Sequence, residues 1–192
     1  MVIACGEFIE NGWDLIKFAV VALVIVIPIR MWIAQPFVVS GESMYPTFHD
    51  GEYLIVDEIS YLIGHENRGD VAIFRYPGDT KRFFIKRIIG LPNEKIVIKN
   101  SKITIINKEN PNGIVLNEPY INGETFSAGD LVNKDGEYIT KDNEYFVMGD
   151  NRNRSSDSRF WGMLPKNLMI GRAYLRLLPF KEISYLPGKY NL

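Results

Sequence analysis

The sequence predicts a mainly β protein: an antiparallel β-rich domain that follows one N-terminal transmembrane helix. A long apolar run near the N-terminus indicates the helix. Short runs rich in Val, Ile, Phe and Tyr follow residue 36, and the Gly- and Pro-containing turns between them indicate strands. A chain of 192 residues, 46% hydrophobic, is long enough for one globular domain and a short appendage. We therefore expect a tail and anchor over residues 1–36 and a β-rich domain over residues 37–192.

Charge and cysteine content exclude several classes of protein. The net charge of -1 provides no basic surface for a phosphate backbone, so nucleic acid is not expected as a partner. Cys5 is the only cysteine, which excludes an intramolecular disulfide and any metal site built from several cysteines. No cofactor and no metal are expected. The domain must therefore be held together by its apolar core.

The apolar run covers residues 15–33 and carries charge only at Lys17 and Arg30. As a helix rising 1.5 Å per residue it would be about 28 Å long, close to the hydrocarbon thickness of a bilayer. Trp13 and Trp32 bracket the run, as interfacial anchors do. These features favour a membrane span.

Two other interpretations of this run fit less well. A buried core helix usually keeps one polar face, whereas residues 18–29 have none. A cleaved secretory signal usually has a shorter apolar stretch behind a basic segment, whereas Glu7, Glu10 and Asp14 precede this one. An uncleaved anchor is the preferred interpretation. The flanking basic residues are too few to set its orientation.

Six runs beyond the anchor have the composition and alternation of β-strands. The expected strands are EYLIVDEI, DVAIFRY, RFFIKRII, EKIVIK, KITIIN and EYFVMG. Their spacing predicts an antiparallel arrangement. The loop-rich stretch 93–143 is expected to form a subdomain inserted between the third and the last of these strands.

The segment SGESMYPT, which begins at residue 40, places Ser40 and Ser43 in a bend marked by glycine and proline. A serine acts as a nucleophile only with a base in hydrogen-bond reach and donors for the oxyanion that forms. On its own the segment is more typical of a plain turn. His49 and His65, the only histidines, lie in loops with no Asp at an informative spacing. A Ser/His/Asp triad therefore stays open but without support.

Lys86 is the stronger candidate for the base. In the strand FFIKRIIG, alternation puts Lys86 on one face with Phe84 and Ile88, and Arg87 on the other. An apolar setting of this kind disfavours the ammonium form, and a neutral lysine can act as a base. The alternative is a strand lysine whose amine reaches the solvent.

Four segments, in order behind the apolar run, resemble the sequence boxes of one enzyme family: GESMYPT, RGDVAIF, IKRIIGLPNEK and MGDNRNRSSDSRFWG. The chain resembles bacterial type I signal peptidase, the leader peptidase with a Ser/Lys dyad, over about residues 13–178. The resemblance implies a membrane-bound serine endopeptidase that removes N-terminal signal peptides from exported preproteins. It also implies a single-pass protein of the cell membrane, with the N-terminus in the cytoplasm and the catalytic domain outside.

The resemblance also assigns roles to individual residues. Ser43 matches the nucleophile, Lys86 the general base, and Ser155 the serine that hydrogen-bonds and orients the lysine. Asp157 and Arg159 match a structural ion pair near the site. The further charged partners implied are Asp150 and Arg87, and the residues implied to line the substrate groove are Phe37, Val39, Phe84 and Ile85.

The chain departs from the family pattern at two positions. Gly41 stands two residues before the nucleophile, where some members carry a serine that supports the oxyanion hole. The oxyanion must then be stabilised by backbone N–H groups, including that of Ser43, and the contribution of Ser40 is open. Asn153 stands where an Asp is common, and nothing in the sequence explains this change.

One apolar set and two rival functions stay open. An apolar face that dips into the lipid is one interpretation of the following residues, and ordinary core packing is the other: Phe37, Val38, Trp161, Met163 and Leu164. The self-cleaving SOS repressors also have a Ser/Lys dyad on a β-rich domain, but a DNA-binding module stands where this chain has its apolar run. A catalytically inactive, membrane-tethered binding module is the second rival, and labelling with an acylating inhibitor would separate it from an enzyme.

Overall fold

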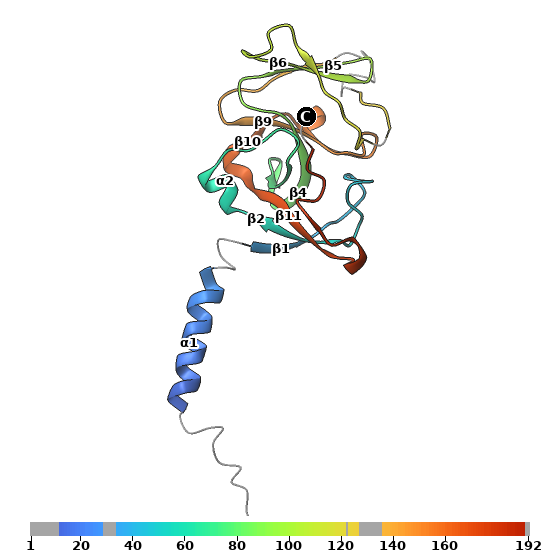
Figure 1. Ribbon diagram of the computed structural model, residues 1–192. Helices are drawn as coiled ribbons and strands as arrows, with labels where there is room; N and C mark the ends of the chain where they lie inside the picture. The colour runs from blue at the N-terminus through green and yellow to red at the C-terminus, as the bar shows by residue number, and fades with distance from the viewer. Residues whose placement is uncertain (1–11, 29–33, 122, 127–135, 191–192) are drawn as a thin grey trace, which may run out of the picture.

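The computed structural model describes residues 12–28, 34–121, 123–126 and 136–190. Helix α1, Gly12–Pro28, stands apart from a β-rich domain (Figure 1). Among the described residues, no helix is both long and apolar enough to cross a membrane. The last part of the expected span, residues 29–33, and Cys5 lie outside the described residues.

Eight strands form the larger sheet, in the order β1-β2-β11-β3-β4-β9-β10, with β12 paired to β11. Every neighbouring pair is antiparallel, so the predicted mainly β, antiparallel fold is confirmed. These strands are β1 Ala34–Val38, β2 Tyr53–Asp57, β3 Val71–Tyr76, β4 Asp79–Gly90, β9 Glu144–Met148, β10 Leu164–Pro165, β11 Met169–Leu178 and β12 Ser184–Tyr185. Because β1 begins at Ala34, the sheet includes residues 34–36, which the sequence analysis assigned to the anchor.

Four strands form a second antiparallel sheet, in the order β7-β6-β5-β8. They are β5 Lys95–Lys99, β6 Lys102–Ile106, β7 Ile114–Val115 and β8 Gly136–Ile139. In the chain this sheet lies between β4 and β9, and in space it lies at the end of the domain far from α1 (Figure 1). All six strands expected from alternation are present, as β2, β3, β4, β5, β6 and β9.

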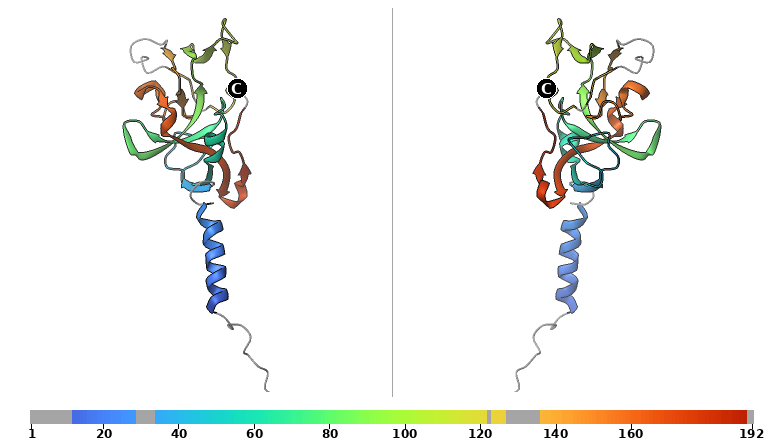
Figure 2. Two further views of the ribbon diagram at one scale, coloured as in Figure 1. Left: turned by 90° about the vertical axis from the view of Figure 1, so that its left-hand side faces the viewer. Right: turned by 90° about the vertical axis from the view of Figure 1, so that its right-hand side faces the viewer.

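Short helices fill the connections between the strands. They are α2 Ile59–Ile63, α3 Ser158–Trp161, η3 Lys166–Leu168 and η4 Phe180–Glu182. Asp157 caps α3 by accepting a hydrogen bond from the backbone N–H of Arg159. Both views of Figure 2 place η4 and β12, coloured red, at the end of the domain that adjoins α1.

Three apolar clusters make up the core. The first joins the loop after β1 to β2, β3 and β11, and it includes Met44, Phe48 and Val56. The second joins the second sheet to β4 and β9 through isoleucines such as Ile89 and Ile96. The third lies around β3, β4 and β9 and takes in α2 and β10: Tyr61, Ala72, Phe74, Ile88, Tyr145, Val147 and Leu164.

The core also decides part of the open question about a lipid-facing surface. Leu164 is fully buried in the third cluster, and Trp161 packs against the same cluster. Met163 packs against the second cluster, and Phe37 against the first. The interpretation as a lipid face is therefore wrong for Leu164, whereas Trp161, Met163 and Phe37 are half-buried residues that pack against the core. Val38 is 52% exposed.

Candidate active site

Ser43 lies in the loop that joins β1 to β2. Gly41, with φ of +87°, turns the backbone in a conformation that favours glycine. Its N–H donates a hydrogen bond of 2.7 Å to Oδ1 of Asp50, which ties the start of the loop to its end. The adjoining Met44 is almost fully buried, at 1% exposure. The serine is thus held on a fixed turn, with an anchored side chain directly after it.

Lys86 lies on β4 and reaches this turn. Its Nζ donates a hydrogen bond of 2.7 Å to Oγ of Ser43 and one of 2.8 Å to the carbonyl oxygen of Ile85. Nζ also lies 5.2 Å from the ring centroid of Phe84. The side chain is 4% exposed, so the alternative of a lysine that reaches the solvent is wrong. The two residues predicted as nucleophile and base are therefore in direct contact.

The surroundings of Lys86 lower its pKa. Burial disfavours the ammonium form and lowers the pKa from 10.5 to about 8. The carboxylates of Asp157 and Asp150 act in the opposite direction, but burial dominates. At neutral pH about a tenth of such amines are neutral, enough for a general base.

Ser155 is buried beside the site, at 6% exposure, but it does not make the predicted contact. Its Oγ has no hydrogen-bond partner among the described residues, so the expected hydrogen bond to Lys86 is absent. The amine is held by Ser43 and by the Ile85 carbonyl in its place. Gly149 also matters here, because a Cβ at that position would collide with the Ser155 side chain and the Ser43 carbonyl.

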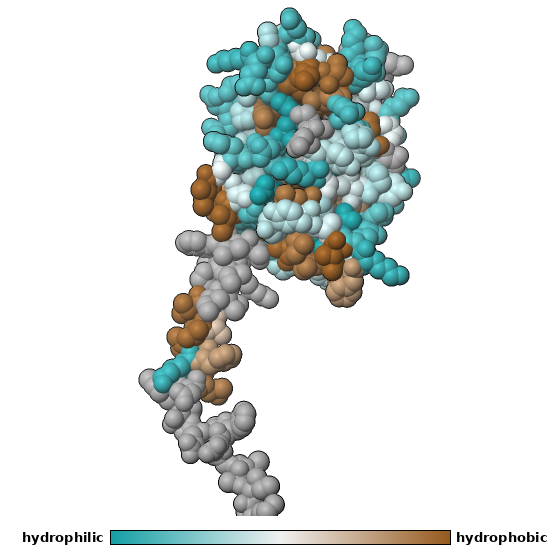
Figure 3. All heavy atoms as spheres, viewed as in Figure 1, coloured by the Kyte–Doolittle hydropathy of each residue, from teal (hydrophilic) through white to brown (hydrophobic). Residues whose placement is uncertain are grey.

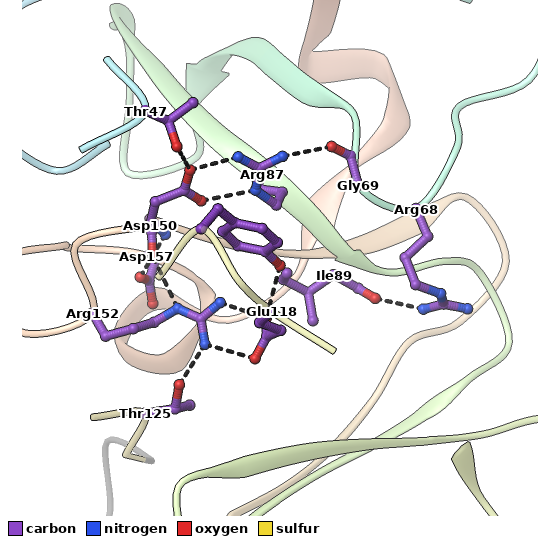
Figure 4. Close-up of polar contacts among 12 residues, drawn as sticks. Thr47, Arg68, Gly69, Arg87, Ile89, Glu118, Thr125, Asp150, Arg152 and Asp157 are labelled. Atoms are coloured by element: carbon purple, nitrogen blue, oxygen red, sulfur yellow. Dashed lines mark hydrogen bonds and ion pairs between the residues drawn. The ribbon is translucent and has the colours of Figure 1, made fainter. Parts of the chain in front are cut away.

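Two fully buried ion pairs flank the dyad. Nε of Arg159 lies 2.8 Å from Oδ1 of Asp157, and the Asp157 carboxylate also accepts from the N–H of Gly149. Arg87, next to Lys86 on β4, forms a two-pronged pair with Asp150, with distances of 2.8 Å and 2.5 Å (Figure 4). Each carboxylate is matched by a guanidinium, which offsets the desolvation of both charges.

The sequence analysis missed a third buried pair, between Arg152 and Glu118. Nη2 of Arg152 donates a hydrogen bond of 2.6 Å to Oε1 of Glu118, and Nε donates to the carbonyl oxygen of Gly149 (Figure 4). This pair connects the segment between β7 and β8 of the second sheet to the loop after β9 that carries Ser155. The residues are far apart in sequence, and charge type alone gave no signal for the pairing.

Asn151 was also missed, although it fixes the nucleophile turn. Its backbone N–H donates to the carbonyl oxygen of Ser43 at 3.1 Å. Its side-chain amide donates to the carbonyl oxygen of Glu42 at 3.0 Å. The loop after β9 therefore holds the turn at residues 42 and 43, in addition to the hydrogen bond from Gly41 to Asp50.

A cleft of about 530 Å³ opens beside the dyad. The residues that the sequence analysis assigned to a groove, together with the dyad, all line it: Phe37, Val39, Ser43, Phe84, Ile85 and Lys86. Its walls come from β1 and the following loop on one side and from β4 on the other. The cleft is therefore mainly apolar, with polar side chains at the dyad and at Ser40, Glu42, Arg82, Arg154 and Ser156.

Donors for an oxyanion are limited in number. The N–H of Gly41 is occupied by Asp50 and so is not free for this task. The remaining candidates at the turn are the N–H of Ser43 and the side chain of Ser40, which lines the cleft. Neither His49 nor His65 lines the cleft.

One group of described residues has the donor atoms for a metal ion: His49, Glu52 and Glu182, whose ligand atoms all lie within 4.8 Å of one another. Arg176 pairs with both carboxylates. Its Nε lies 3.1 Å from Glu52 and its Nη1 lies 2.9 Å from Glu182. The carboxylates of this group are therefore already engaged in ion pairs.

The geometry agrees with comparisons to known proteins. The family model described as signal peptidase, peptidase S26, matches residues 12–178. The chain belongs to this signal peptidase family. The probable signal peptidase I-2 of Synechocystis sp. is 35% identical over 92% of this chain and 78% of its own. The signal peptidase I of Bacillus amyloliquefaciens is 36% identical over 89% of this chain and 88% of its own.

The chain is also similar in sequence to a protein of known structure. A crystal structure of a signal peptidase I from Enterococcus faecalis V583 is 29% identical, and the match covers 57% of this chain and 97% of that one, with a TM-score of 0.45. The protein is thus a signal peptidase, a hydrolase of the family that acts on preproteins.

Proposed function

We propose that this signal peptidase cleaves its substrates with a dyad of Ser43 and Lys86 and that it works from the cell membrane. One observation carries the proposal: the 2.7 Å hydrogen bond between Lys86 Nζ and Ser43 Oγ, with the lysine buried at 4% exposure. A serine with a depressed-pKa amine in contact has what nucleophilic catalysis requires.

The reaction follows from this geometry in two stages. Neutral Lys86 takes the proton of the Ser43 hydroxyl while Oγ bonds to the carbonyl carbon of the scissile peptide. The ammonium then gives this proton to the leaving amine as the C–N bond breaks, so that the signal peptide remains on Oγ as an ester. Water attacks the ester, Lys86 again takes a proton, and the proton returns to Oγ. The N–H of Ser43 and the hydroxyl of Ser40 are the proposed oxyanion donors.

The substrate is proposed to bind as an extended strand. β1 is an edge strand, and β4 pairs with β9 only from Arg87 onward, so both cleft walls offer unpaired backbone groups. A strand laid between these edges would gain main-chain hydrogen bonds on both sides. Phe37, Val39, Phe84 and Ile85 would then limit the size of its side chains.

The membrane anchor is proposed over residues 15–33, with the N-terminus in the cytoplasm and residues 37–192 outside the cell. Its support is the apolar, exposed surface of α1, which includes Leu15 and Phe18 (Figure 3). Phe180 and Ile183 also expose apolar side chains, on the segment that adjoins α1 in Figure 2. Lipid contact at both places would hold the cleft near a substrate that is still inserted through its own apolar signal.

The experiment is a cleavage assay. The purified chain in detergent is incubated with a preprotein, and the new N-terminus is sequenced; an acylating serine inhibitor identifies the labelled residue. Cleavage that survives Ser43→Ala would refute the dyad.

The anchor requires a separate test. A shortened chain should begin at Ala34, so that β1 is kept, and should cleave a soluble peptide while losing rate on membrane-inserted preproteins. Equal rates on the membrane-inserted substrate with and without residues 1–33 would refute the anchoring role.

A further inference from the structure

A second hollow adjoins the cleft next to the turn that carries Ser43. It measures about 380 Å³ and is lined by Glu42, Tyr45, Asn151, Asn153 and Arg154. Two of these, Glu42 and Arg154, also line the apolar cleft that contains the dyad. The two hollows therefore meet at this pair of residues.

Glu42 and Arg154 are joined by an ion pair across the meeting point. The two side chains are 61% and 70% exposed, so a bound chain can reach both charges. Arg87 and Arg159 are buried and need a carboxylate partner to balance their charge, whereas the exposed Glu42 and Arg154 do not. An exposed pair contributes little to stability, which leaves these charges available for a ligand.

The position of this pair is fixed relative to the nucleophile. Glu42 directly precedes Ser43, and Asn151 holds the carbonyl oxygens of both residues at 3.0 Å and 3.1 Å. Asn151 also lines the second hollow. A substrate whose scissile carbonyl lies at Ser43 must therefore extend past this hollow. The residues on one side of the cut then lie next to it.

We propose that the second hollow binds the first residues of the mature protein, those that follow the cut, and that the Glu42–Arg154 pair sets which charges are accepted there. The inference depends on the proposed role of Ser43 as nucleophile. The apolar cleft takes the residues before the cut, so the residues after it lie in the polar hollow. The paired charges neutralise each other, so the site accepts an acidic or a basic residue about equally.

The pairing gives a reciprocal test. In Glu42→Gln the guanidinium of Arg154 is unpaired and attracts an acidic residue after the cut. In Arg154→Gln the carboxylate of Glu42 is unpaired and attracts a basic residue. Each variant should change the ratio of kcat/KM between substrates with Asp and with Lys by about three- to tenfold, in opposite directions. The double variant should return to the wild-type ratio.

The assay uses the full chain in detergent and preproteins that differ only at the first two residues after the cut. Lys95 and Glu137 form a similarly exposed pair on the second sheet, 2.8 Å apart, and Lys95→Gln and Glu137→Gln are the matched controls. The controls should leave the Asp-to-Lys ratio unchanged. The changes in the Glu42 and Arg154 variants should also shrink as salt is added, because exposed charges are screened.

The outcomes separate this inference from the proposed dyad. Wild-type cleavage that needs Ser43, with an Asp-to-Lys ratio unaffected by Arg154→Gln, overturns the inference and leaves the dyad intact. Cleavage that does not need Ser43 overturns both. Glu42 adjoins Ser43, so Glu42→Gln could slow the cleavage of all substrates equally. In that case the result for Arg154→Gln alone decides whether the inference holds.

Discussion

The amine of Lys86 donates a 2.7 Å hydrogen bond to the hydroxyl of Ser43, although the two residues lie 43 positions apart in the chain. Each is fixed independently. The serine lies on a turn held by Asp50 and Asn151, and the lysine projects from the middle of β4. The contact therefore arises from two rigid elements, and it predicts how the enzyme responds to pH and to substitution.

The rate of cleavage should rise with pH through the pKa of Lys86. The proposed base is the neutral amine, and burial lowers the pKa of the amine to about 8. Below this value most molecules carry the inactive ammonium, so kcat/KM should fall about tenfold per pH unit, and it should level off above the pKa. Measuring kcat/KM from about pH 6 to 10 checks this. A midpoint near 6.5 that disappears in His49→Gln or His65→Gln would assign the base to a histidine.

Lys86→Arg should abolish cleavage although it keeps the positive charge, because a guanidinium does not lose its proton in this range. The control is Lys81→Arg, an exposed lysine on the same strand, which should keep full activity. Substantial activity of Lys86→Arg with the wild-type pH profile would show that the proton goes elsewhere.

The dyad residues should act as one unit. Ser43→Ala and Lys86→Ala should each reduce kcat by about a thousandfold or more, and the double variant should lose little beyond that. Single-turnover rates of the three variants, with circular dichroism to verify folding, provide the measurement. Additive losses would contradict a shared step.

Ser155→Ala should reduce activity less than Lys86→Ala does. The hydroxyl has no hydrogen-bond partner among the described residues, while the Lys86 amine is already held at two points. Removing an unpaired buried hydroxyl should also change the free energy of unfolding by no more than about 1 kcal/mol. Chemical denaturation and kcat/KM together test this, and a loss as large as that of Lys86→Ala would mean that Ser155 orients the amine during the reaction.

Asp150→Asn should destabilise the fold, because it leaves the charge of Arg87 buried without a carboxylate to balance it. Both side chains of the pair are 0% exposed, and breaking such a pair costs about 3–5 kcal/mol. Arg87→Met combined with Asp150→Leu should recover part of the loss. Denaturant unfolding measures all three variants, and Glu137→Gln at an exposed pair is the control. A change below about 1 kcal/mol in Asp150→Asn would contradict the expectation.

The sequence analysis predicted the strands in which buried and exposed residues alternate regularly. It missed a strand whose pairing with its neighbours contains register shifts. β2 and β5 bury every second residue, so their pattern is visible in the sequence. β11 runs through the middle of the larger sheet, but register shifts near Gly171, Ala173 and Arg176 break the alternation. No strand was assigned there.

The site was predicted in the same uneven way. Ser43 and Lys86 stand in short, distinctive segments, and the structure brings them into contact. Partners such as Glu118 and Asn151 are set by the folded path of loops, which local residue patterns do not encode. The prediction that Ser155 contacts Lys86 was wrong for a related reason. The contact depends on the direction of the Ser155 side chain, which its position in the sequence does not determine.

The carbonyl oxygen of Gly188 accepts a hydrogen bond from Arg87, which precedes it by 101 positions and directly follows Lys86. A ribosome must therefore have made the chain as far as residue 188 before this hydrogen bond of Arg87 can form. Until then the nascent chain contains Ser43 and Lys86, but Arg87, the neighbour of Lys86, lacks one of its hydrogen-bond partners. A nascent chain arrested before residue 188 should accordingly have a less firmly held Arg87 and lower cleavage activity than the full chain.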